Sequence, residues 1–565
     1  MTRGSEGICD ALIEAGVDHV FGIPGGGTIP IWDSLFSRQD RIKVVLARHE
    51  QAAACMADMY GRLTGKPAVL MGQGAFIASS GGFGILEAYL ASSPMVVLTD
   101  TSEGGTFSQH GTYQVGTGEY GAYDLKGILR SMSKYTTYAV TPEETVQGVQ
   151  LAVKHATVGR PGPACVVMRS GAITAEINPS RVPKIYHSSG YLKESRTVPP
   201  AELIAEAAAL ILTAERPVII AGNGVHMSKS HGEVLALAEF LGAPVATSYK
   251  GKSAIAEVHP LALGMMGAFG QKVANDVVAS ADVIVVAGCH LAPSDTKNES
   301  PHLIDPSRQK IVQIDVDPRN AGWVYPVEMS LIGDLKLVLS QLVGIMKERG
   351  GVKAPGADER AQALAQRKRE GGFFDAPECH SDASPILPQR IVKEIENAVD
   401  ESAMITLDAG NNRLWMSHFF QSKAAATVFC PGGVAGMGWG PPAAVAAKLL
   451  NPDRPVLSVV GDGGFAMELH VLSTALQYQA PAVFVVMNNS ILGMVRDGQR
   501  ERTIATEFIP TDFAQIARGF GAHGVNVSKP QELGLVIKEA LKATRPTVID
   551  VATSTEEPFF KMISR

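Results

Sequence analysis

Short runs of apolar residues alternate with longer segments of helical character along most of the chain. The first part carries the runs HVFGIPG, KVVLARHE, PAVLMGQG and PMVVLTD, and later parts carry PVIIAG, DVIVVAG, KIVQIDVD, VLSVV and AVFVVM. Short apolar runs that end in turn residues are typical of buried strands, and helices between them favour parallel pairing. The pattern predicts an α/β protein built from Rossmann-like, doubly wound domains with parallel sheets.

Two polar segments divide the chain into three blocks. Residues 174–200 are polar and punctuated by proline. Residues 347–387 hold a charged, Gly- and Ala-rich helix, DERAQALAQRKREGG, followed by a Pro- and Asp-rich stretch. Because linkers have this composition, we expect an N-terminal domain at 1–175, a central domain at 195–345 and a C-terminal domain at 385–565. A chain of 565 residues is too long for a single hydrophobic core, which agrees with this division.

Composition narrows the classes of partner. The formal net charge is −6, and the six cysteines are scattered without a C-x-x-C pair. Such a chain lacks the basic excess that nucleic acid or an anionic membrane attracts, and scattered cysteines indicate packed, reduced thiols. The N-terminal residues lack the apolar core of a signal peptide, and no apolar run is long enough to span a membrane. We therefore expect a cytoplasmic protein that acts on small molecules, with no nucleic acid and no membrane as partner.

The most informative stretch follows the apolar run VLSVV. It reads GDGG at 461–464 and leads, through one helical segment and another apolar run, to a pair of asparagines that ends at Asn489. Gly-rich turns at a helix start suit a phosphate, and carboxylate and amide oxygens suit Mg²⁺. We expect Asp462, Asn489 and the carbonyl of Ile491 to bind this metal. The expected phosphate contacts are Gly461, Gly463 and Gly464. The alternative is a common G-D-G turn with a chance pair of asparagines.

The turn, its spacing and the asparagine pair resemble the cofactor motif of the thiamine diphosphate enzymes, the superfamily of pyruvate oxidase, pyruvate decarboxylase and acetohydroxyacid synthase. In that superfamily the cofactor lies at a dimer interface and meets a glutamate from the other subunit's N-terminal domain. The stretch LARHEQAAACMADMYG matches the segment with this glutamate, at Glu50. The resemblance implies that Glu50 shares a proton with the aminopyrimidine ring and so activates the cofactor. Without it, Glu50 is an ordinary acidic residue at a helix N-terminus.

Three further segments resemble parts of the same cofactor site. In PGGVAGMGWGPPAA, Met437 matches the bulky residue that keeps the cofactor bent, and the Ala435 carbonyl matches a contact to its aminopyrimidine. The alternative for this segment is a Gly-rich loop with a packing methionine. The segments LDAGNNRLW and GMVRDGQ match loops beside the diphosphate. The contacts that they imply are Gly410, Asn411, Asn412, Gly493 and Met494.

The resemblance is strongest to the catalytic subunits of acetohydroxyacid (acetolactate) synthases, and it covers essentially the whole chain. FGIPGGGTIPIWDSL resembles their opening, and IAGNGVH and YKGKSAIAEVHPLALGMMGAFG resemble the FAD-binding region of their central domain. A lone G-x-G also occurs in strand-to-helix turns that bind nothing, so FAD, ADP and no nucleotide all stay open for this domain. The family implies a homodimer or homotetramer and leaves the presence of a regulatory subunit open.

Several positions depart from the family pattern. Thr112 and Tyr113 replace the His-His pair of simple decarboxylases, and Val495 replaces their glutamate after the asparagine pair. Acetohydroxyacid synthases carry a tryptophan where this chain has Gly498, and their arginine-bearing central segment reads GCHLAPSDTKN here. These departures disfavour a simple decarboxylase and indicate a changed pocket for the second substrate.

Polar residues of the first domain are candidates for work on the substrate. Gln114 and His110 are the main candidates, and Gln109 and Glu119 lie nearby in the sequence. A histidine in such a loop is more often hydrogen-bonded than catalytic, and this alternative stays open for His110.

The resemblance implies a thiamine-diphosphate-dependent carboligase of acetolactate-synthase type, with Mg²⁺ as its metal. Such an enzyme decarboxylates a 2-oxo acid and ligates the enamine to a second carbonyl compound. The alternative is a C–C lyase of the same family, which acts as a 2-hydroxyacyl-CoA lyase, a decarboxylase or a diketone-cleaving enzyme. A non-catalytic nucleotide-binding protein has no joint use for Glu50, Met437 and Asp462, and a nicotinamide dehydrogenase lacks its full G-x-G-x-x-G turn here.

Overall fold

The described residues of the chain form two compact units. The structure, a computed structural model, describes residues 2–102, 114–181, 186–192, 196–556 and 559. The first unit comprises Met1–Ser195, Pro431–Pro452 and Met467–Ala480, and the second comprises Arg196–Cys430, Asp453–Ala466 and Pro481–Arg565. Two segments from the third block of the sequence, 431–452 and 467–480, therefore belong to the same unit as the N-terminal residues.

The first unit contains a six-stranded sheet whose neighbouring strands are all parallel. Its strands are β1 (His19–Gly22), β2 (Lys43–Leu46), β3 (Ala68–Gln73), β4 (Met95–Thr101), β5 (Tyr135–Ala139) and β6 (Pro163–Arg169). Their order is β2-β1-β3-β4-β6-β5. The chain moves from β1 to β2 on one side and then crosses to β3 on the other, so the strand order reverses between β1 and β3. Open α/β sheets bind ligands at the carboxyl ends of strands beside such a point.

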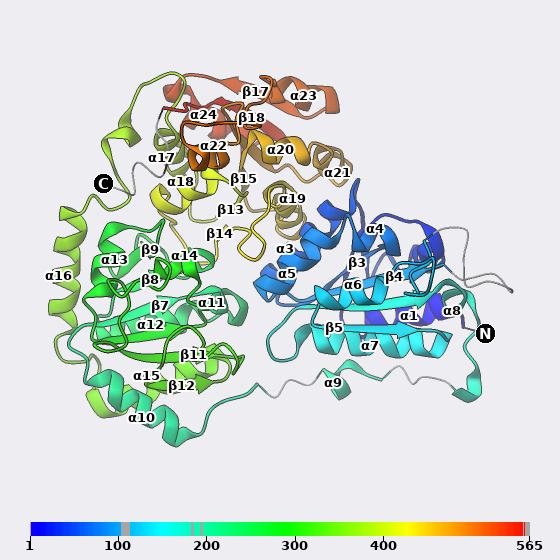
Figure 1. Ribbon diagram of the computed structural model, residues 1–565, viewed down its shortest axis with the longest axis horizontal. Coiled ribbons are helices and arrows are strands. Elements are labelled where there is room, and N and C mark those ends of the chain that lie inside the picture. Colours follow the sequence, from blue (N-terminus) through cyan, green and yellow to red (C-terminus); the bar gives the residue numbers. More distant parts are fainter. Residues whose placement is uncertain (1, 103–113, 182–185, 193–195, 557–558, 560–565) are drawn as a thin grey trace. The chain divides into compact units, whose positions relative to one another are not determined.

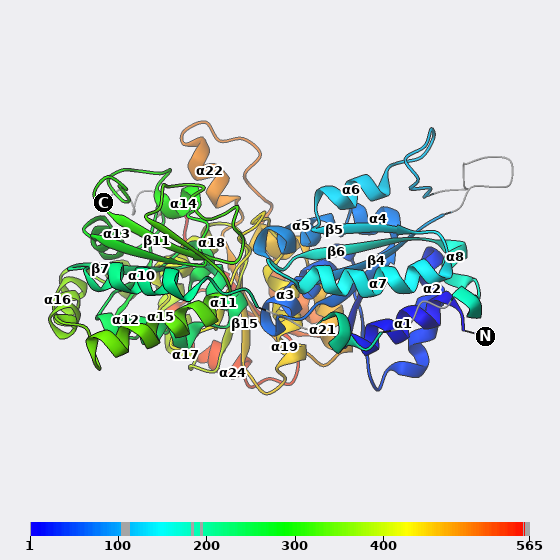
Figure 2. The same cartoon turned by 90° about the horizontal axis from the view of Figure 1, so that it is seen from below.

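Helices cover both faces of this sheet, with α1 and α7 on one face and α4 and α6 on the other (Figure 2). The helices of the first unit are α1 (Gly4–Glu14), α2 (Ile29–Leu35), α3 (Glu50–Thr64), α4 (Gly74–Ala78), α5 (Gly82–Ala91), α6 (Leu125–Ser131), α7 (Pro142–Thr157), α8 (Ser170–Thr174), α9 (Ser188–Tyr191), α19 (Gly440–Leu450) and α21 (Val471–Gln477). Alternate residues of the strands, such as Val96 and Leu98, point into the core that α1 and α7 close.

The helix α3 positions the candidate catalytic glutamate. It begins at Glu50, directly after the N-cap residue His49, and ends at Thr64, before the C-cap residue Gly65, whose φ of 71° suits glycine. Small residues along α3 let α5 pack closely, because a Cβ on Gly84 would lie only 2.4 Å from the Cβ of Ala54. The helix α19 packs on α3 as well. The helix α3 is therefore packed between two neighbouring helices, α5 and α19.

The second unit contains two more six-stranded sheets, and the first of them is built from the central part of the chain. Its strands are β7 (Pro217–Ala221), β8 (Val245–Thr247), β9 (Ala262–Met265), β10 (Val283–Ala287), β11 (Lys310–Asp315) and β12 (Met329–Ile332), in the order β12-β11-β10-β7-β8-β9. The helices around it are α10 (Ala201–Leu212), α11 (Asn223–Ser228), α12 (His231–Leu241), α13 (Lys272–Ala279), α14 (Pro293–Thr296), α15 (Leu335–Gly350) and α16 (Ala357–Glu370). Burial of the Val- and Ile-rich strands, such as β10, forms one contiguous apolar core with α10, α12 and α15.

The third sheet also has six parallel strands (Figure 1). Its strands are β13 (Met404–Leu407), β14 (Val428–Phe429), β15 (Val456–Gly461), β16 (Val483–Asn488), β17 (His523–Val527) and β18 (Thr547–Ala552), in the order β14-β13-β15-β16-β18-β17. The helices α17 (Pro388–Ala398), α18 (Asn411–Phe419), α20 (Asp462–Met467), α22 (Gly493–Gln499), α23 (Phe513–Phe520) and α24 (Pro530–Ala540) connect them. Here the strand order reverses between β13 and β15.

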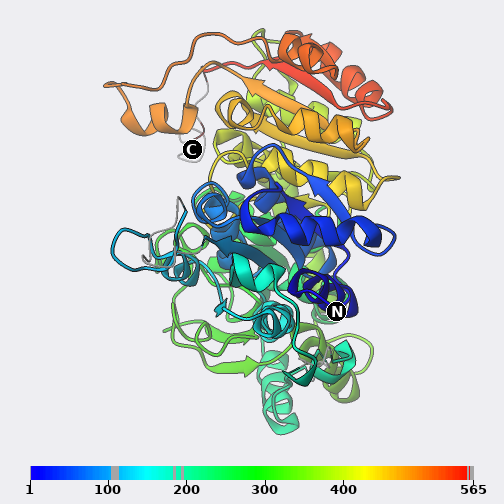
Figure 3. The ribbon, with the colours of Figure 1, turned by 90° about the vertical axis from the view of Figure 1, so that its right-hand side faces the viewer.

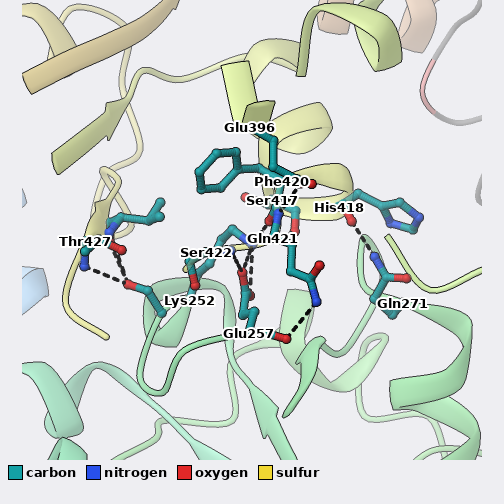
Figure 4. A network of polar contacts seen from close by, with 12 residues as sticks. Lys252, Glu257, Gln271, Glu396, Ser417, His418, Phe420, Gln421, Ser422 and Thr427 are labelled. Carbon is teal, nitrogen blue, oxygen red and sulfur yellow. Dashed lines mark hydrogen bonds and ion pairs between the residues drawn. The ribbon is translucent and has the colours of Figure 1, made fainter. Parts of the chain in front are cut away.

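A buried ion pair ties the central sheet's connections to α18 within the second unit (Figure 4). Lys252 Nζ lies 2.9 and 2.8 Å from the two carboxylate oxygens of Glu257, and it also donates to the carbonyls of Ser417 and Phe420 at 3.3 and 2.7 Å. The Ser422 N–H donates to Glu257 Oε2 at 2.8 Å. A buried pair is tolerated when its remaining hydrogen-bonding capacity is filled in this way. The network holds the C-terminal end of α18, the helix that begins at Asn411.

The predicted fold class is confirmed, because the structure has three parallel sheets flanked by helices. All six cysteines are buried thiols outside any disulfide, as their scattered positions predicted. In the described part of the chain, no helix has both the length and the apolar character needed to cross a membrane. The charged helix predicted inside the second linker is confirmed as α16, which packs on the core of the central sheet.

Candidate cofactor site

The third sheet brings the predicted diphosphate and metal residues to one edge. Gly410 to Asn412 follow β13, and the GDGG turn follows β15. These are the two strands between which the strand order reverses, and β16 beside them ends at Asn488. All three segments lie at carboxyl ends of parallel strands, where this class of sheet binds ligands.

Asp462 and Asn489 lie in direct contact. Asp462 Oδ2 accepts hydrogen bonds from the backbone N–H groups of Asn489 and Ser490, at 3.0 and 2.5 Å, and Oδ1 accepts from Gly463 N at 2.7 Å. Asn489 Oδ1 in turn accepts from the N–H of Ile491 at 3.2 Å. Burial raises the pKa of Asp462, although these donors act against the shift. The three residues predicted to bind the metal are therefore neighbours, around a buried carboxylate that a cation would stabilise.

The side chain of Asn411 supports the assignment of a ligand to this edge. Its Oδ1 is buried and has no hydrogen-bond partner among the described residues, whereas its Nδ2 donates to Asp497 at 3.0 Å. A Cβ on Gly493 would lie 3.1 Å from Asn411 Nδ2 and 3.9 Å from Asn489 Nδ2. Gly493 thus leaves space between Asn411 and Asn489, whose side-chain oxygens are suitable metal ligands. These residues fit a divalent cation and a diphosphate.

No group of three or more His, Cys, Asp and Glu side chains in the described part of the chain is arranged to hold a metal. The set at Asp462 is of a different kind, since it combines one carboxylate with amide and backbone oxygens. Mg²⁺ accepts such a set because substrate phosphates and waters complete its octahedron.

The other residues predicted to bind the diphosphate, Gly464, Asn412 and Gly410, have different structural surroundings. A Cβ on Gly464 would lie 2.1 Å from Asp408 Oδ2, so any other residue here would have to displace the buried Asp408 carboxylate. Asn412 Nδ2 donates to the carbonyls of Asp408 and Val459 at 3.0 and 3.2 Å. Asn412 therefore joins the ends of β13 and β15, and its contact with a cofactor stays a prediction. Gly410 has a φ of 111°, which suits glycine at the start of α18.

The segment after the asparagine pair stands out from its sheet. Figure 3 shows α22 projecting from the body of the second unit. Met494 packs against the core of the third sheet, whereas Val495 is 47% exposed. A Cβ on Gly498 would meet no atom within 4 Å. The absence of a large side chain at this position leaves open space in the described structure.

In the first unit, Glu50 is half-buried, and the residue that follows it contacts the loop that carries Met437. The next residue, Gln51, donates through Nε2 to Glu468 Oε1 at 2.7 Å, and a Cβ on Gly438 would lie 2.9 Å from the same Nε2. The segment that contains Glu50 therefore packs against the Met437 loop of the same chain, and the contact of Glu50 with a cofactor stays a prediction. Met437 itself is half-buried.

Sequence reasoning missed the residue that holds this loop. Glu87 Oε1 accepts from the N–H groups of Gly432 and Gly433 at 2.8 and 2.9 Å, and Oε2 accepts from Val434 and Ala435 at 2.8 and 3.0 Å. Arg62 also donates to Oε1 at 2.8 Å. A lone glutamate inside the apolar helical segment GFGILEAYLA was the available signal, because such a residue is buried only when it is paired.

The electrostatics of this cluster favour an ionised Glu87. Burial by itself raises the pKa of Glu87, but the charge of Arg62 and the backbone donors outweigh it and lower the pKa to about 2. Arg62 also pairs with Asp58 at 2.8 Å, and Asp58 accepts from the indole of Trp439 at 2.8 Å. The loop from 432 to 439 is thus fixed at both ends by one buried ionic cluster.

The candidate substrate residues are described only in part. Gln114 adopts a φ of 60°, and its carbonyl accepts from the N–H of Ser102 at 3.4 Å, so it lies beside the end of β4. Glu119 is exposed in the same stretch. The candidates His110 and Gln109 lie outside the described residues, as do Thr112 and Tyr113.

Known proteins resemble this chain along almost its whole length. Three models of the thiamine pyrophosphate enzymes match it: the N-terminal TPP binding domain at residues 2–118, the central domain at 204–342 and the C-terminal TPP binding domain at 408–551. A probable acetolactate synthase large subunit of Methanocaldococcus jannaschii is 33% identical, over 98% of this chain and 92% of the relative. The isozyme 3 large subunit of acetolactate synthase from Escherichia coli is 30% identical, over 100% and 96% of the two chains. The chain therefore belongs to the thiamine pyrophosphate enzyme family, among the relatives of the acetolactate synthase large subunits.

Proposed function

We propose that the protein is a thiamine-diphosphate-dependent carboligase of acetolactate-synthase type. It decarboxylates a 2-oxo acid and joins the remaining fragment to a second carbonyl compound. The observation that carries this proposal is the contact between Asp462 and Asn489 at the point where the strand order reverses, beside the unpartnered oxygen of Asn411. Membership of the family supports it, and so does the match of Glu50 to the family's glutamate.

In this proposal, each predicted site residue has a role in binding the cofactor or in moving a proton. Asp462, Asn489 and the Ile491 carbonyl hold Mg²⁺. Backbone groups of the GDGG turn and of the segments at 410–412 and 493–494 hold the diphosphate. When bound, thiamine diphosphate supplies the electron sink for decarboxylation. Glu50 holds the proton at the aminopyrimidine, and Met437 and the Ala435 carbonyl orient that ring. Gln114 and His110 are proposed to move protons on the substrate.

Assembly, location and domain boundaries are part of the proposal. We propose a homodimer or homotetramer in the cytoplasm, in which Glu50 serves the cofactor of the neighbouring subunit. Domains at 1–175, 195–345 and 385–565 agree with the strands of the three sheets, each of which falls within one of these ranges. Light scattering of the purified protein measures the assembly, and limited proteolysis tests the boundaries.

A flavin or ADP in the central domain is a further proposal that the resemblance supports. The central sheet reverses its strand order between β7 and β10, where Gly224 N donates to Gly288 O at 2.9 Å. A Cβ on Gly222 would lie 2.3 Å from the same carbonyl, so close backbone packing already accounts for these glycines. The absorption spectrum of the purified protein, together with release of any nucleotide on denaturation, tests this proposal.

One experiment tests the main reaction. The purified protein is incubated with thiamine diphosphate, Mg²⁺ and a panel of 2-oxo acids, with and without aldehyde and ketone acceptors, and the products are identified by mass. Release of CO₂ together with a ligated product is the expected result. Cleavage of a 2-hydroxyacyl-CoA or a diketone, without any ligation, would instead support the lyase alternative. Absence of both activities would contradict the proposal.

A further inference from the structure

Asp100 is a buried carboxylate at the ligand-binding edge of the N-terminal sheet. It is the penultimate residue of β4, and it is 3% exposed. The strand β3 lies between β4 and β1, and the strand order reverses between β1 and β3. The GIPGGG loop after β1 and the start of α8 after β6 meet Asp100 at the same carboxyl edge. This edge also carries Glu50, which follows β2.

The GIPGGG loop is shaped around this carboxylate. Asp100 Oδ2 accepts from Gly27 N at 2.8 Å and from Ser170 Oγ at 3.4 Å. A Cβ on Gly27 would lie 2.8 Å from Oδ2, and a Cβ on Gly26, whose φ is 55°, would lie 3.1 Å from it. The two glycines therefore let the loop close over one oxygen of Asp100.

The other oxygen of Asp100 is left without a partner. Asp100 Oδ1 is buried and makes no hydrogen bond to any residue that the structure describes, and the same holds for the buried hydroxyl of Tyr123. Burial raises the pKa of Tyr123 to about 12, and the nearby charge of Asp100 adds to the shift. Each unsatisfied buried polar atom costs roughly 1–3 kcal/mol, so a ligand that bonded both groups would recover part of this cost.

The chemistry of the two groups indicates what they can bind. An ionised or hydrogen-bond-accepting carboxyl oxygen favours a ligand group that donates, such as a hydroxyl, and repels a second carboxylate. Burial raises the pKa of Asp100, although the surrounding N–H donors and the Ser170 hydroxyl act against the shift. A tyrosine hydroxyl can donate to a carbonyl or hydroxyl oxygen. Together they suit a small, uncharged, hydroxylated molecule.

We propose that Asp100 Oδ1 and the Tyr123 hydroxyl form a subsite for the second substrate, which is a neutral hydroxylated aldehyde or ketone. This inference rests on the proposed carboligation and adds the chemical class of the acceptor. Asp100 accepts a hydrogen bond from the acceptor's hydroxyl group, and Tyr123 donates one to an acceptor oxygen. A 2-oxo acid is a poor acceptor at this subsite, because its carboxylate would face the Asp100 carboxyl group.

Two acceptors of equal size test the subsite. Glycolaldehyde and propanal have the same number of heavy atoms and differ by a hydroxyl in place of a methyl group. With pyruvate as donor, the wild-type protein is expected to prefer glycolaldehyde by at least about tenfold in kcat/KM, because a site built for a hydroxyl rejects the analogue that lacks it. In the Asp100→Asn and Tyr123→Phe variants this ratio should fall below about threefold. Asp124→Asn is the matched control, since Asp124 caps α6 in the same region and asparagine keeps that cap.

A ratio near one in the wild-type protein, or an unchanged ratio in both variants, would overturn the subsite. The ratio compares two acceptors on the same enzyme, so a general loss of folded protein does not move it. CO₂ release from pyruvate without any acceptor reports separately on the proposed function, and its absence in the wild-type protein would overturn that function instead. The thermal midpoint of the cofactor-free protein then separates a ligand-binding role of Tyr123 from a purely structural one. Removal of the unpartnered hydroxyl in Tyr123→Phe should leave the midpoint unchanged or raise it, whereas a clear drop would show a purely structural role.

Discussion

Glu87 Oε2 accepts a hydrogen bond from the backbone nitrogen of Ala435 at 3.0 Å, across 348 positions of sequence. With the neighbouring donors at 432–434, one carboxylate satisfies four consecutive N–H groups of the loop that carries Met437. These amides are therefore unavailable for a diphosphate. The loop contributes to the site through its side chains and carbonyls, while Glu87 acts as a positioning residue behind it.

The first prediction concerns this carboxylate. Glu87→Gln replaces one acceptor oxygen by an NH₂ group that faces two N–H donors. It also removes the negative charge that pairs with Arg62. Hydrogen exchange of the two amides within 432–435 that face the NH₂ group should become at least about tenfold faster, because they lose their acceptor. The free energy of unfolding should fall by about 3 kcal/mol, since a buried ionic partner is lost.

Glu144→Gln is the control for this change. Glu144 also accepts two backbone N–H groups, from Val140 and Thr141 at 2.8 and 3.1 Å, but at the start of α7. Its substitution should leave exchange at 432–435 at the wild-type rate. Unaltered exchange in the Glu87 variant would refute the positioning role.

The second prediction concerns the metal. Asp462→Ala removes the single carboxylate of the proposed Mg²⁺ site, so the affinity for thiamine diphosphate in the presence of Mg²⁺ should fall by at least about a hundredfold. Calorimetric titration measures the affinity, and circular dichroism checks the fold. Asp453→Ala, at an exposed position, should bind as the wild-type protein does. Equal affinity in the two variants would rule out the assignment.

The third prediction concerns Glu50. Glu50→Gln should still bind the cofactor but slow the exchange of its C2 proton by about 10²–10⁴-fold, as the loss of a positioned acid–base group does. NMR in deuterated solvent follows the exchange. Glu143→Gln changes an acidic residue in the first turn of α7 and should exchange normally. A wild-type rate in the Glu50 variant would show that this glutamate is only a helix N-terminal residue.

The fourth prediction concerns stability and pH. Burial and then the neighbouring His49 lower the pKa of His470 to about 4, whereas histidine in an unfolded chain titrates near about 6.5. Between these values the unfolded chain binds the extra proton, so His470 contributes stability above about pH 6.5 that is lost as the pH falls toward 4. The difference is at most about 3 kcal/mol. Urea unfolding at about pH 7 and about pH 5 should show a smaller loss in His470→Gln than in the wild-type protein. His187→Gln, which alters an exposed histidine, should follow the wild-type curve.

The fifth prediction concerns the open space at Gly498. Because a Cβ there meets no atom within 4 Å, Gly498→Trp should fold with a thermal midpoint close to the wild-type value. If this position borders the second substrate, the indole should shift preference toward 2-oxobutyrate and away from bulkier uncharged acceptors, by roughly 0.8 kcal/mol per methylene excluded. Competition assays with pyruvate as donor measure the shift. Gly519→Trp, at a second position with open space, should leave the preference unchanged, and an equal shift in both variants would contradict the interpretation.

The sequence by itself determined the architecture and the ligand-bearing strand ends. Short Val- and Ile-rich runs between helical segments predict parallel strands from local periodicity alone, and three such sheets are present. The contact between Asp462 and Asn489 was predictable for the same reason. Each residue follows a strand, the strands are adjacent, and the carboxyl ends of parallel strands share one edge.

Tertiary structure decided which buried polar groups are satisfied, and by what. Glu87 finds four N–H donors far along the chain, whereas Asp100 Oδ1 and the Tyr123 hydroxyl find none among the described residues. No periodicity or turn pattern reports such contacts, because they depend on how distant segments pack rather than on their own conformational preferences. The same packing joins 431–452 and 467–480 to the N-terminal unit, against the order of the chain. Local chemistry thus predicts the edge where a ligand binds, and long-range packing decides which side chains at that edge stay free to bind it.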